Sequence, residues 1–182
     1  NEVIDENQWV KSYKNQLYYM KDELLRNDID FKNLNTVFFG GGTPSLMPLG
    51  IIERILDISI NIFGFDTDIE ITLEANPSSY DRTKFIKLKD IGINRLSIGL
   101  QSLNDRYLKF LGRLHSVKDV NVATRDASSI FDNISVDIIY AFYGQDLIEW
   151  TNELESFLKA NNLHHLSLYQ LTIEAGTKFF KD

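Results

Sequence analysis

The sequence predicts a single α/β domain in which parallel strands are joined by crossover helices. Three observations indicate this fold class. Segments with the period of a helix alternate with short segments that read as strands. These short segments are apolar, as in a sheet covered on both faces. The helices between them are long enough to return the chain to the start of a parallel neighbouring strand. The 182 residues, 43% of them hydrophobic, suffice to bury one core.

The first third of the chain predicts a helix, a strand and a second helix. Residues 5–27 place large apolar side chains three or four positions apart, which is the period of an amphipathic helix. These side chains are Trp9, Tyr13, Leu17, Met20 and Leu24. We expect Trp9 in the core. Residues 36–39 form an apolar strand, and a helix from about 49 to 63 ends at Gly64.

The middle third predicts two further strands with a helix between them. Residues 68–77 form a strand that Pro77 closes, and residues 79–91 form a helix with Gly92 in the C′ position. Residues 94–102 form the next strand. Ser102 or Asn104 can then cap a short helix.

The last third repeats the alternation, with helices at 116–131 and 145–160 and strands at 134–142 and 164–173. Strands separated by helices of this length pair in parallel through right-handed crossovers. An open doubly wound sheet and an arc of a β/α barrel both fit. Five strands do not close an eight-stranded barrel, so a barrel would be incomplete in this chain.

Composition narrows the function classes. A net charge of −7 with scattered Lys and Arg argues against nucleic acid as a partner. The sequence shows no transmembrane segment and no signal-peptide pattern, so we expect a cytoplasmic protein. There is no cysteine, which excludes disulfides and thiolate metal sites within these residues. Consecutive side chains on a strand point to opposite faces, which argues against a metal pair at His164 and His165.

Polar residues follow the carboxyl ends of the predicted strands, where α/β folds bind ligands. They are Gly41, Gly42, Thr43, Glu74, Asn76, Gln101, Arg113, Asp137, Tyr169 and Thr172. Glycines expose backbone groups to a ligand, but no P-loop lysine or G-x-G-x-x-G spacing accompanies them. Carboxylates beside bare backbone suit a cation and hydroxyls, such as an ammonium and a ribose.

Each of these residues also has a purely structural interpretation. The glycines could form only a tight turn, and Glu74 could pair with a nearby lysine. Asp137 could have a structural partner within the sheet. Arg113 could be a solvated helix residue, and His115 could interact with a helix dipole. The functional interpretation therefore depends on all of them meeting at one rim.

Five motifs follow one another along the chain: FFGGGTPSL, LEANP, NRLSIGLQSLNDRYLKFLGRLH, SVDIIY and SLYQLTIEAGT. In order and spacing they resemble the radical S-adenosylmethionine proteins related to oxygen-independent coproporphyrinogen III oxidase, and most closely the heme chaperones of the HemW type. The resemblance covers residues 9 to 179. It implies a partial β/α barrel that holds S-adenosylmethionine and a [4Fe–4S] cluster, with heme as cargo in the chaperone branch.

The resemblance also implies a role for individual positions. Gly41, Gly42 and Thr43 match the motif for the methionine ammonium, and Glu74 matches its acidic partner.

The remaining matches concern the other end of the ligand. Gln101 and Asp137 match residues near the ribose, and Arg113 matches the residue that faces the methionine carboxylate. Thr172 falls where backbone contacts to adenine are expected.

Two departures from the family pattern stand out. The family holds its cluster with C-x-x-x-C-x-x-C, and this chain has no cysteine, so we expect it to be inactive alone. We therefore expect residues 1–182 to be a single, incomplete radical SAM core domain, without the first strand and its cluster loop and without the C-terminal part. Ala141 and Tyr143 stand where the family has Gly and Pro.

Three functions remain open at this stage. The chain could be the core of a HemW-like heme chaperone that passes heme to a recipient protein. It could be the core of an anaerobic coproporphyrinogen oxidase acting on a porphyrin precursor, or a degenerate fragment that binds nothing. The sequence offers no clear heme ligand among its candidates, which are Met20, Met47, His115, His164 and His165.

Overall fold

The structure is a computed structural model that describes residues 5–161, 163 and 165–181, so His164 lies outside the described residues. Its strands are β1 (Leu34–Phe39), β2 (Phe65–Ala75), β3 (Arg95–Gln101), β4 (Asn133–Tyr140) and β5 (His165–Gln170). Its helices are α1 (Glu6–Arg26), η1 (Pro44–Leu46), α2 (Leu49–Phe63), η2 (Pro77–Ser79), α3 (Arg82–Asp90), α4 (Asp105–Phe110), α5 (Val117–Ile130), α6 (Leu147–Ala160) and α7 (Lys178–Lys181).

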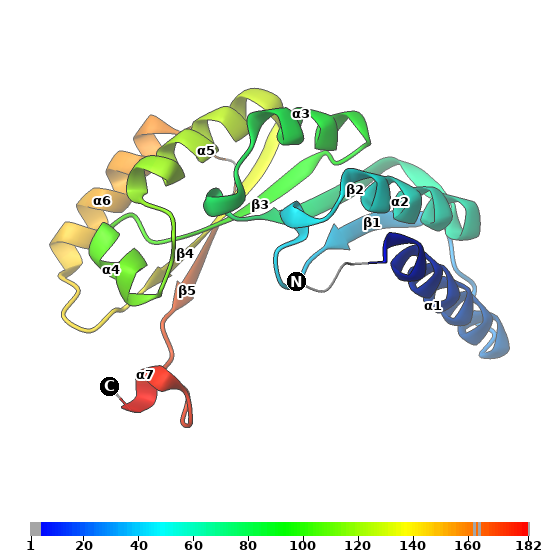
Figure 1. Cartoon of the computed structure of the whole chain (residues 1–182), viewed down its shortest axis with the longest axis horizontal. Helices are drawn as coiled ribbons and strands as arrows, with labels where there is room; N and C mark the ends of the chain where they lie inside the picture. Colours follow the sequence, from blue (N-terminus) through cyan, green and yellow to red (C-terminus); the bar gives the residue numbers. More distant parts are fainter. Residues whose placement is uncertain (1–4, 162, 164, 182) are drawn as a thin grey trace.

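The five strands form one parallel sheet in the sequential order β1-β2-β3-β4-β5. The sheet curls into a half-barrel, with α2, α3, α5 and α6 along its outer side (Figure 1). A doubly wound sheet would reverse its strand order and carry helices on both faces. The arc of a β/α barrel is therefore the correct choice between the two predicted architectures.

Most predicted elements are confirmed to within a few residues, but the predicted helix 79–91 is divided. Residues 77–79 form the 3₁₀ turn η2, and α3 starts only after Asp81. The Asp81 carboxylate accepts hydrogen bonds from the backbone N–H groups of Thr83 and Lys84, at 2.8 and 3.2 Å, and so caps the helix.

The core lies between the outer face of the sheet and the helices. Leu73, Leu96 and Val136, which are fully buried, alternate along their strands with side chains that face the inside of the arc. The prediction of strands that are apolar on both faces is wrong for this inner face. It is polar: Arg95 donates a 3.2 Å hydrogen bond to Thr72 Oγ1, and an ion pair of 3.6 Å joins Arg95 to Glu70.

Helix α1 lies beside the sheet edge formed by β1 and packs against α2 (Figure 1). Lys21 donates a 2.9 Å hydrogen bond to the Ile62 carbonyl and fixes this packing. The expectation that Trp9 is a core residue is wrong, because its side chain is 45% exposed. Trp9 and Tyr13 instead line an apolar groove of about 600 Å³ between α1 and β1.

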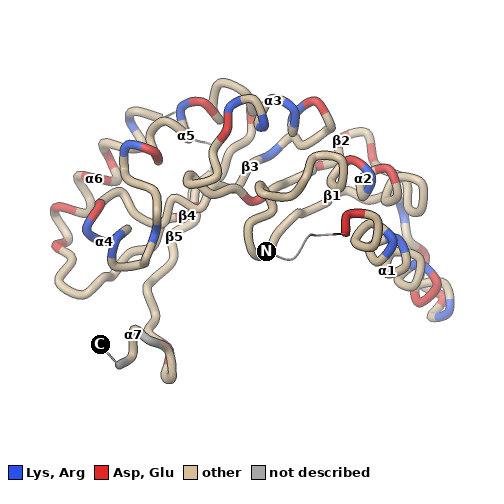
Figure 2. Tube along the Cα trace, viewed as in Figure 1, with Lys and Arg blue, Asp and Glu red and all other residues tan. Residues whose placement is uncertain are grey.

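Charged residues are distributed mainly along the helices. Over the described residues, Lys and Arg positions are interleaved with Asp and Glu along α1 and α5 (Figure 2), whereas α3 is mainly basic. Among these residues, no helix combines the length and apolar character needed to cross a membrane.

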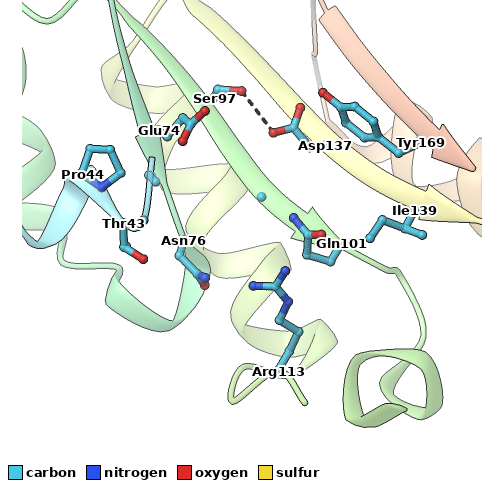
Figure 3. Close-up of a pocket in the computed structure, with 13 residues that line it drawn as sticks. Thr43, Pro44, Glu74, Asn76, Ser97, Gln101, Arg113, Asp137, Ile139 and Tyr169 are labelled. Carbon is cyan, nitrogen blue, oxygen red and sulfur yellow. Dashed lines mark hydrogen bonds between the residues drawn. The ribbon is translucent and has the colours of Figure 1, made fainter. Parts of the chain in front are cut away.

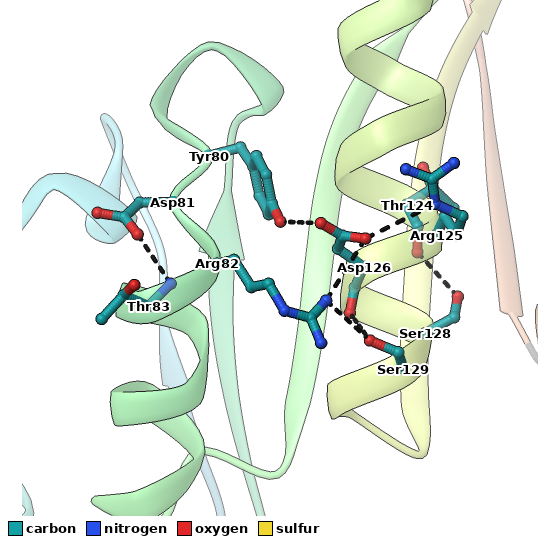
Figure 4. A network of polar contacts seen from close by, with 9 residues as sticks. All are labelled: Tyr80, Asp81, Arg82, Thr83, Thr124, Arg125, Asp126, Ser128 and Ser129. Atoms are coloured by element: carbon teal, nitrogen blue, oxygen red, sulfur yellow. Dashed lines mark hydrogen bonds and ion pairs between the residues drawn. The ribbon is translucent and has the colours of Figure 1, made fainter.

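A polar network joins α3 to α5 on the outer side of the arc (Figure 4). The Tyr80 hydroxyl donates a hydrogen bond to the Asp126 carboxylate, and Arg82 lies 3.4 Å from the same carboxylate. Burial and this hydrogen bond raise the pKa of Tyr80 to about 12. The same hydrogen bond, together with Arg82, lowers the pKa of Asp126.

We expect Tyr80→Phe to lower the free energy of unfolding by about 1 kcal/mol, because Asp126 loses a hydrogen-bond donor. The pKa of about 12 means that the folded protein retains the Tyr80 proton up to about pH 12, whereas the unfolded chain releases it near the ordinary tyrosine pKa of 10.0. Stability from this group is therefore complete below pH 10 and is lost as the pH rises toward 12. Urea unfolding between pH 8 and 12 measures both effects.

Tyr143→Phe is the matched control, because the Tyr143 side chain is 97% exposed. If Tyr80→Phe and Tyr143→Phe have the same stability at pH 8 and the same alkaline decline, the network does not stabilise the fold.

Candidate functional site

A cavity of about 480 Å³ lies at the carboxyl ends of the strands, inside the arc; we call it the rim pocket (Figure 3). Its volume is in the range of small-ligand sites. It is lined by residues from β2 to β5 and the loops after β1, β2 and α4. They are Gly42, Thr43, Pro44, Glu74, Ala75, Asn76, Ser97, Gly99, Gln101, Arg113, Asp137, Ile139 and Tyr169.

Six of the eight residues predicted to bind a cofactor line this pocket: Gly42, Thr43, Glu74, Gln101, Arg113 and Asp137. Gly41 does not line the pocket, but its N–H is hydrogen-bonded to Glu74, which does. Thr172 is not brought to the pocket. It is exposed and follows the end of β5, because the chain leaves the sheet after Gln170.

The glycine run after β1 has a different requirement at each position. Gly41 and Gly42 have φ values of +87° and +62°, a region that glycine adopts without strain. Gly40 is needed for space, since a Cβ there would lie 2.8 Å from the Phe38 ring and 3.2 Å from Glu74 Oε1. The run therefore lets the chain turn tightly against the Glu74 carboxylate.

Glu74 is the acceptor that holds this loop. The Gly41 N–H donates a 3.1 Å hydrogen bond to Glu74 Oε2, which links β2 to the loop after β1. Glu74 is half-buried, and its side chain points into the pocket (Figure 3). No lysine is paired with it among the described ion pairs, so the lysine-partner alternative is not supported.

The end of β3 is irregular where it enters the pocket. Ile98 and Gln101 of β3 are three residues apart, but their partners on β4, Val136 and Ile138, are only two apart. One extra residue on β3 is the pattern of a β-bulge. Gln101 has a φ of +70°, and its amide folds back over Gly99. A Cβ on Gly99 would lie 2.8 Å from Gln101 Nε2, so this side-chain position depends on glycine.

Asp137 and Arg113 supply opposite charges on separate elements. Asp137 accepts a 3.3 Å hydrogen bond from the buried Ser97 hydroxyl, which is the structural partner that a half-buried carboxylate needs. Arg113 is exposed and extends toward the pocket from the loop after α4 (Figure 3). Two carboxylates and one guanidinium therefore surround one hollow.

Ser97 and Ile139 are pocket residues that the sequence analysis missed. Ser97 pairs in register with Glu74, and Ile139 follows Asp137 by two positions on β4. Residues two apart on a strand share a face, so this periodicity could have identified both of them.

The interpretation of His115 as a helix-dipole partner is wrong. Its ring is only 5% exposed, and its Nε2 donates a 3.1 Å hydrogen bond to the Leu100 carbonyl. The imidazole belongs to the packing of the β3 end rather than to a solvated helix terminus.

The donor set of the rim pocket favours an organic ligand over a metal. Within the described residues, no three His, Asp or Glu side chains are grouped to hold a metal ion, and the chain contains no cysteine. Carboxylates suit an ammonium or hydroxyl groups, and a guanidinium suits a carboxylate. The pocket can therefore bind a small zwitterion that carries additional positive charge.

A family model, several named relatives and a solved structure match this chain. The family model for the radical SAM superfamily matches residues 7–157. The heme chaperone HemW of Buchnera aphidicola subsp. Acyrthosiphon pisum (strain APS) is 37% identical over 179 residues, which are 98% of this chain and 46% of that protein. The mitochondrial radical S-adenosyl methionine domain-containing protein 1 of Bos taurus is 39% identical over 150 residues, which are 82% of this chain and 34% of that protein.

Among solved structures, coproporphyrinogen III oxidase (HemN) from Escherichia coli, a radical SAM enzyme, superposes with a TM-score of 0.77 at 21% identity. The match covers 92% of this chain and 37% of that one. This likeness concerns the fold. The chain spans less than half the length of each of these three proteins.

We expect Glu74→Ala to release the glycine loop, because the Gly41 N–H loses its acceptor. Amide exchange at Gly41 should become roughly fivefold faster, the equivalent of about 1 kcal/mol for one hydrogen bond. Hydrogen–deuterium exchange with peptide resolution over residues 38–46 measures this. Glu53→Ala, on the exposed side of α2, is the control. Equal exchange in the two variants would show that Glu74 does not hold the loop.

Proposed function

Because the chain belongs to the radical SAM superfamily, we propose that the rim pocket binds S-adenosylmethionine and that the protein is a heme chaperone of the HemW type. The observation that carries the first part is the meeting of Glu74, Asp137 and Arg113 at one hollow. The similarity to proteins named heme chaperones supports the second part.

The charges of the ligand match those of the pocket. S-adenosylmethionine carries an ammonium, a sulfonium and a carboxylate, so its net charge is positive. Glu74 and the loop at Gly41 and Gly42 would face the ammonium, and Arg113 would pair with the carboxylate. Asp137 and Gln101 would accept and donate hydrogen bonds at the ribose hydroxyls.

For the adenine, the pocket offers partners other than Thr172. Thr172 lies outside the pocket, whereas Ile139 and Tyr169 line it beyond Asp137. Tyr169 is 55% exposed and offers an aromatic surface to a purine. We therefore assign the base to Ile139 and Tyr169 rather than to Thr172.

The family also implies a [4Fe–4S] cluster, which in family members supplies the electron that cleaves S-adenosylmethionine. The 182 residues contain no cysteine, so they do not fit as its ligands. The role proposed for these residues is to bind and orient the nucleoside.

We expect Glu74→Ala and Asp137→Ala each to weaken S-adenosylmethionine binding by about 1.5–3 kcal/mol, because each removes a charged partner from the pocket. Isothermal titration calorimetry on the intact protein measures the affinity. Asp57→Ala, on an exposed position of α2, is the matched control and should bind as the wild type does. Unchanged affinity in both pocket variants would remove these carboxylates from the site.

A second experiment separates chaperone from oxidase. We expect the intact protein to bind hemin with a Soret shift and to leave coproporphyrinogen III unchanged under anaerobic reducing conditions with S-adenosylmethionine. The product assay is chromatography of the porphyrins after oxidation. Decarboxylation of coproporphyrinogen III would contradict the chaperone assignment in favour of the oxidase. If the protein neither binds hemin nor decarboxylates coproporphyrinogen III, both the chaperone and the oxidase assignments are contradicted.

A further inference from the structure

We propose that His115 is a positioning residue of the rim pocket, which fixes the Arg113 guanidinium by tying its loop to the end of β3. His115 does not line the rim pocket. The inference rests on the proposed function, because it concerns how the pocket binds the carboxylate of S-adenosylmethionine.

The first step is the protonation state of the ring. His115 Nε2 lies 3.1 Å from the Leu100 carbonyl oxygen, which can only accept a hydrogen bond. Nε2 therefore carries the proton. Nδ1 is buried without a hydrogen-bond partner among the described residues. The ring thus makes one specific polar contact, and that contact ends at β3.

The second step is the place of that contact in the sheet. Leu100 is fully buried and lies within the bulge between Ile98 and Gln101. A buried carbonyl at an irregular position needs a donor, because an unpaired one destabilises the fold. His115 supplies this donor immediately before Gln101, whose amide lines the pocket.

The third step is the loop that carries Arg113. Helix α4 ends in a Schellman motif, in which Gly112 has a φ of +67° and the Arg113 N–H donates a 2.9 Å hydrogen bond to the Leu108 carbonyl. This motif fixes the start of the loop. Leu114 is 94% exposed and adds no packing, so the next fixed point is His115.

Arg113 therefore lies between two anchors, the Schellman motif on one side and the His115 contact on the other. Loss of the His115 contact would free the loop while leaving the guanidinium present.

The test is a double-mutant cycle on the intact protein, with S-adenosylmethionine affinity measured by calorimetry. We expect Arg113→Ala and His115→Ala each to weaken binding roughly tenfold or more. If His115 acts through Arg113, the double variant should bind about as weakly as Arg113→Ala alone. His115→Gln places an amide N–H near the position of Nε2 and should restore affinity to within about threefold of the wild type.

Multiplicative losses in the double variant, or no loss in His115→Ala, would overturn the inference. A purely structural role predicts the same loss with and without Arg113. Should His115→Ala fold poorly, His115→Gln is compared with His115→Asn instead. The shorter asparagine amide does not reach the Leu100 carbonyl, so His115→Asn should bind S-adenosylmethionine weakly. Equal affinities of these two variants would also overturn it.

A second readout does not involve the ligand. Hydrogen–deuterium exchange over residues 99–101 and 112–116 should increase in His115→Ala and not in His115→Gln. If the wild type does not bind S-adenosylmethionine, the proposed function fails, while this exchange pattern still decides whether His115 anchors the loop. Unchanged exchange in His115→Ala would overturn the anchoring role.

Discussion

The structure depends on one constraint: five parallel strands that follow one another in the sheet in the order in which they follow one another in the sequence. Each of these crossovers places its helix on the same side of the sheet, so α2, α3, α5 and α6 cover only the outer face (Figure 1). The sheet curves around the uncovered face. All five carboxyl ends then point to the same rim, and residues as far apart in the sequence as Gly42 and Tyr169 line one pocket.

The same constraint explains why the inner face is polar. Side chains that alternate with the core residues face the inside of the arc, where hydroxyls and charges find partners across neighbouring strands. Thr72 and Ser135 are almost fully buried there, and the Ser135 hydroxyl is hydrogen-bonded to His165 Nδ1 at 2.7 Å. This pairing offsets the cost of burying polar atoms and leaves hydrogen-bonding groups around the ligand position.

The sequence predicted the order and type of the elements well, because apolar periodicity and helix-ending glycines are local signals. It also located Glu74, Gln101 and Asp137 at one rim, because parallel strands align their carboxyl ends. It misplaced Trp9, whose surroundings depend on which face α1 presents. It also gave no sign that Thr172 lies beyond the end of β5 and outside the lining of the pocket. The role of His115 could not be predicted, because it depends on the bulge in β3, and the sequence has no clear marker for that irregularity.

Backbone strain is concentrated at the pocket rim. Gln101 and Ala141 have φ values of +70° and +66° and lie at the carboxyl ends of β3 and β4. For residues with a Cβ, this region costs roughly 1–2 kcal/mol relative to a helical or extended conformation.

Ala141 stands where the family motif has glycine. The Gln145 side chain compensates by accepting 2.7 and 3.2 Å hydrogen bonds from the N–H groups of Ala141 and Phe142. Position 141 therefore keeps a left-handed conformation without a glycine there. Tyr143, which is 97% exposed, occupies the proline position without any steric conflict. The departure from the family motif alters the residues of this loop and leaves Asp137 and Ile139 directed into the pocket.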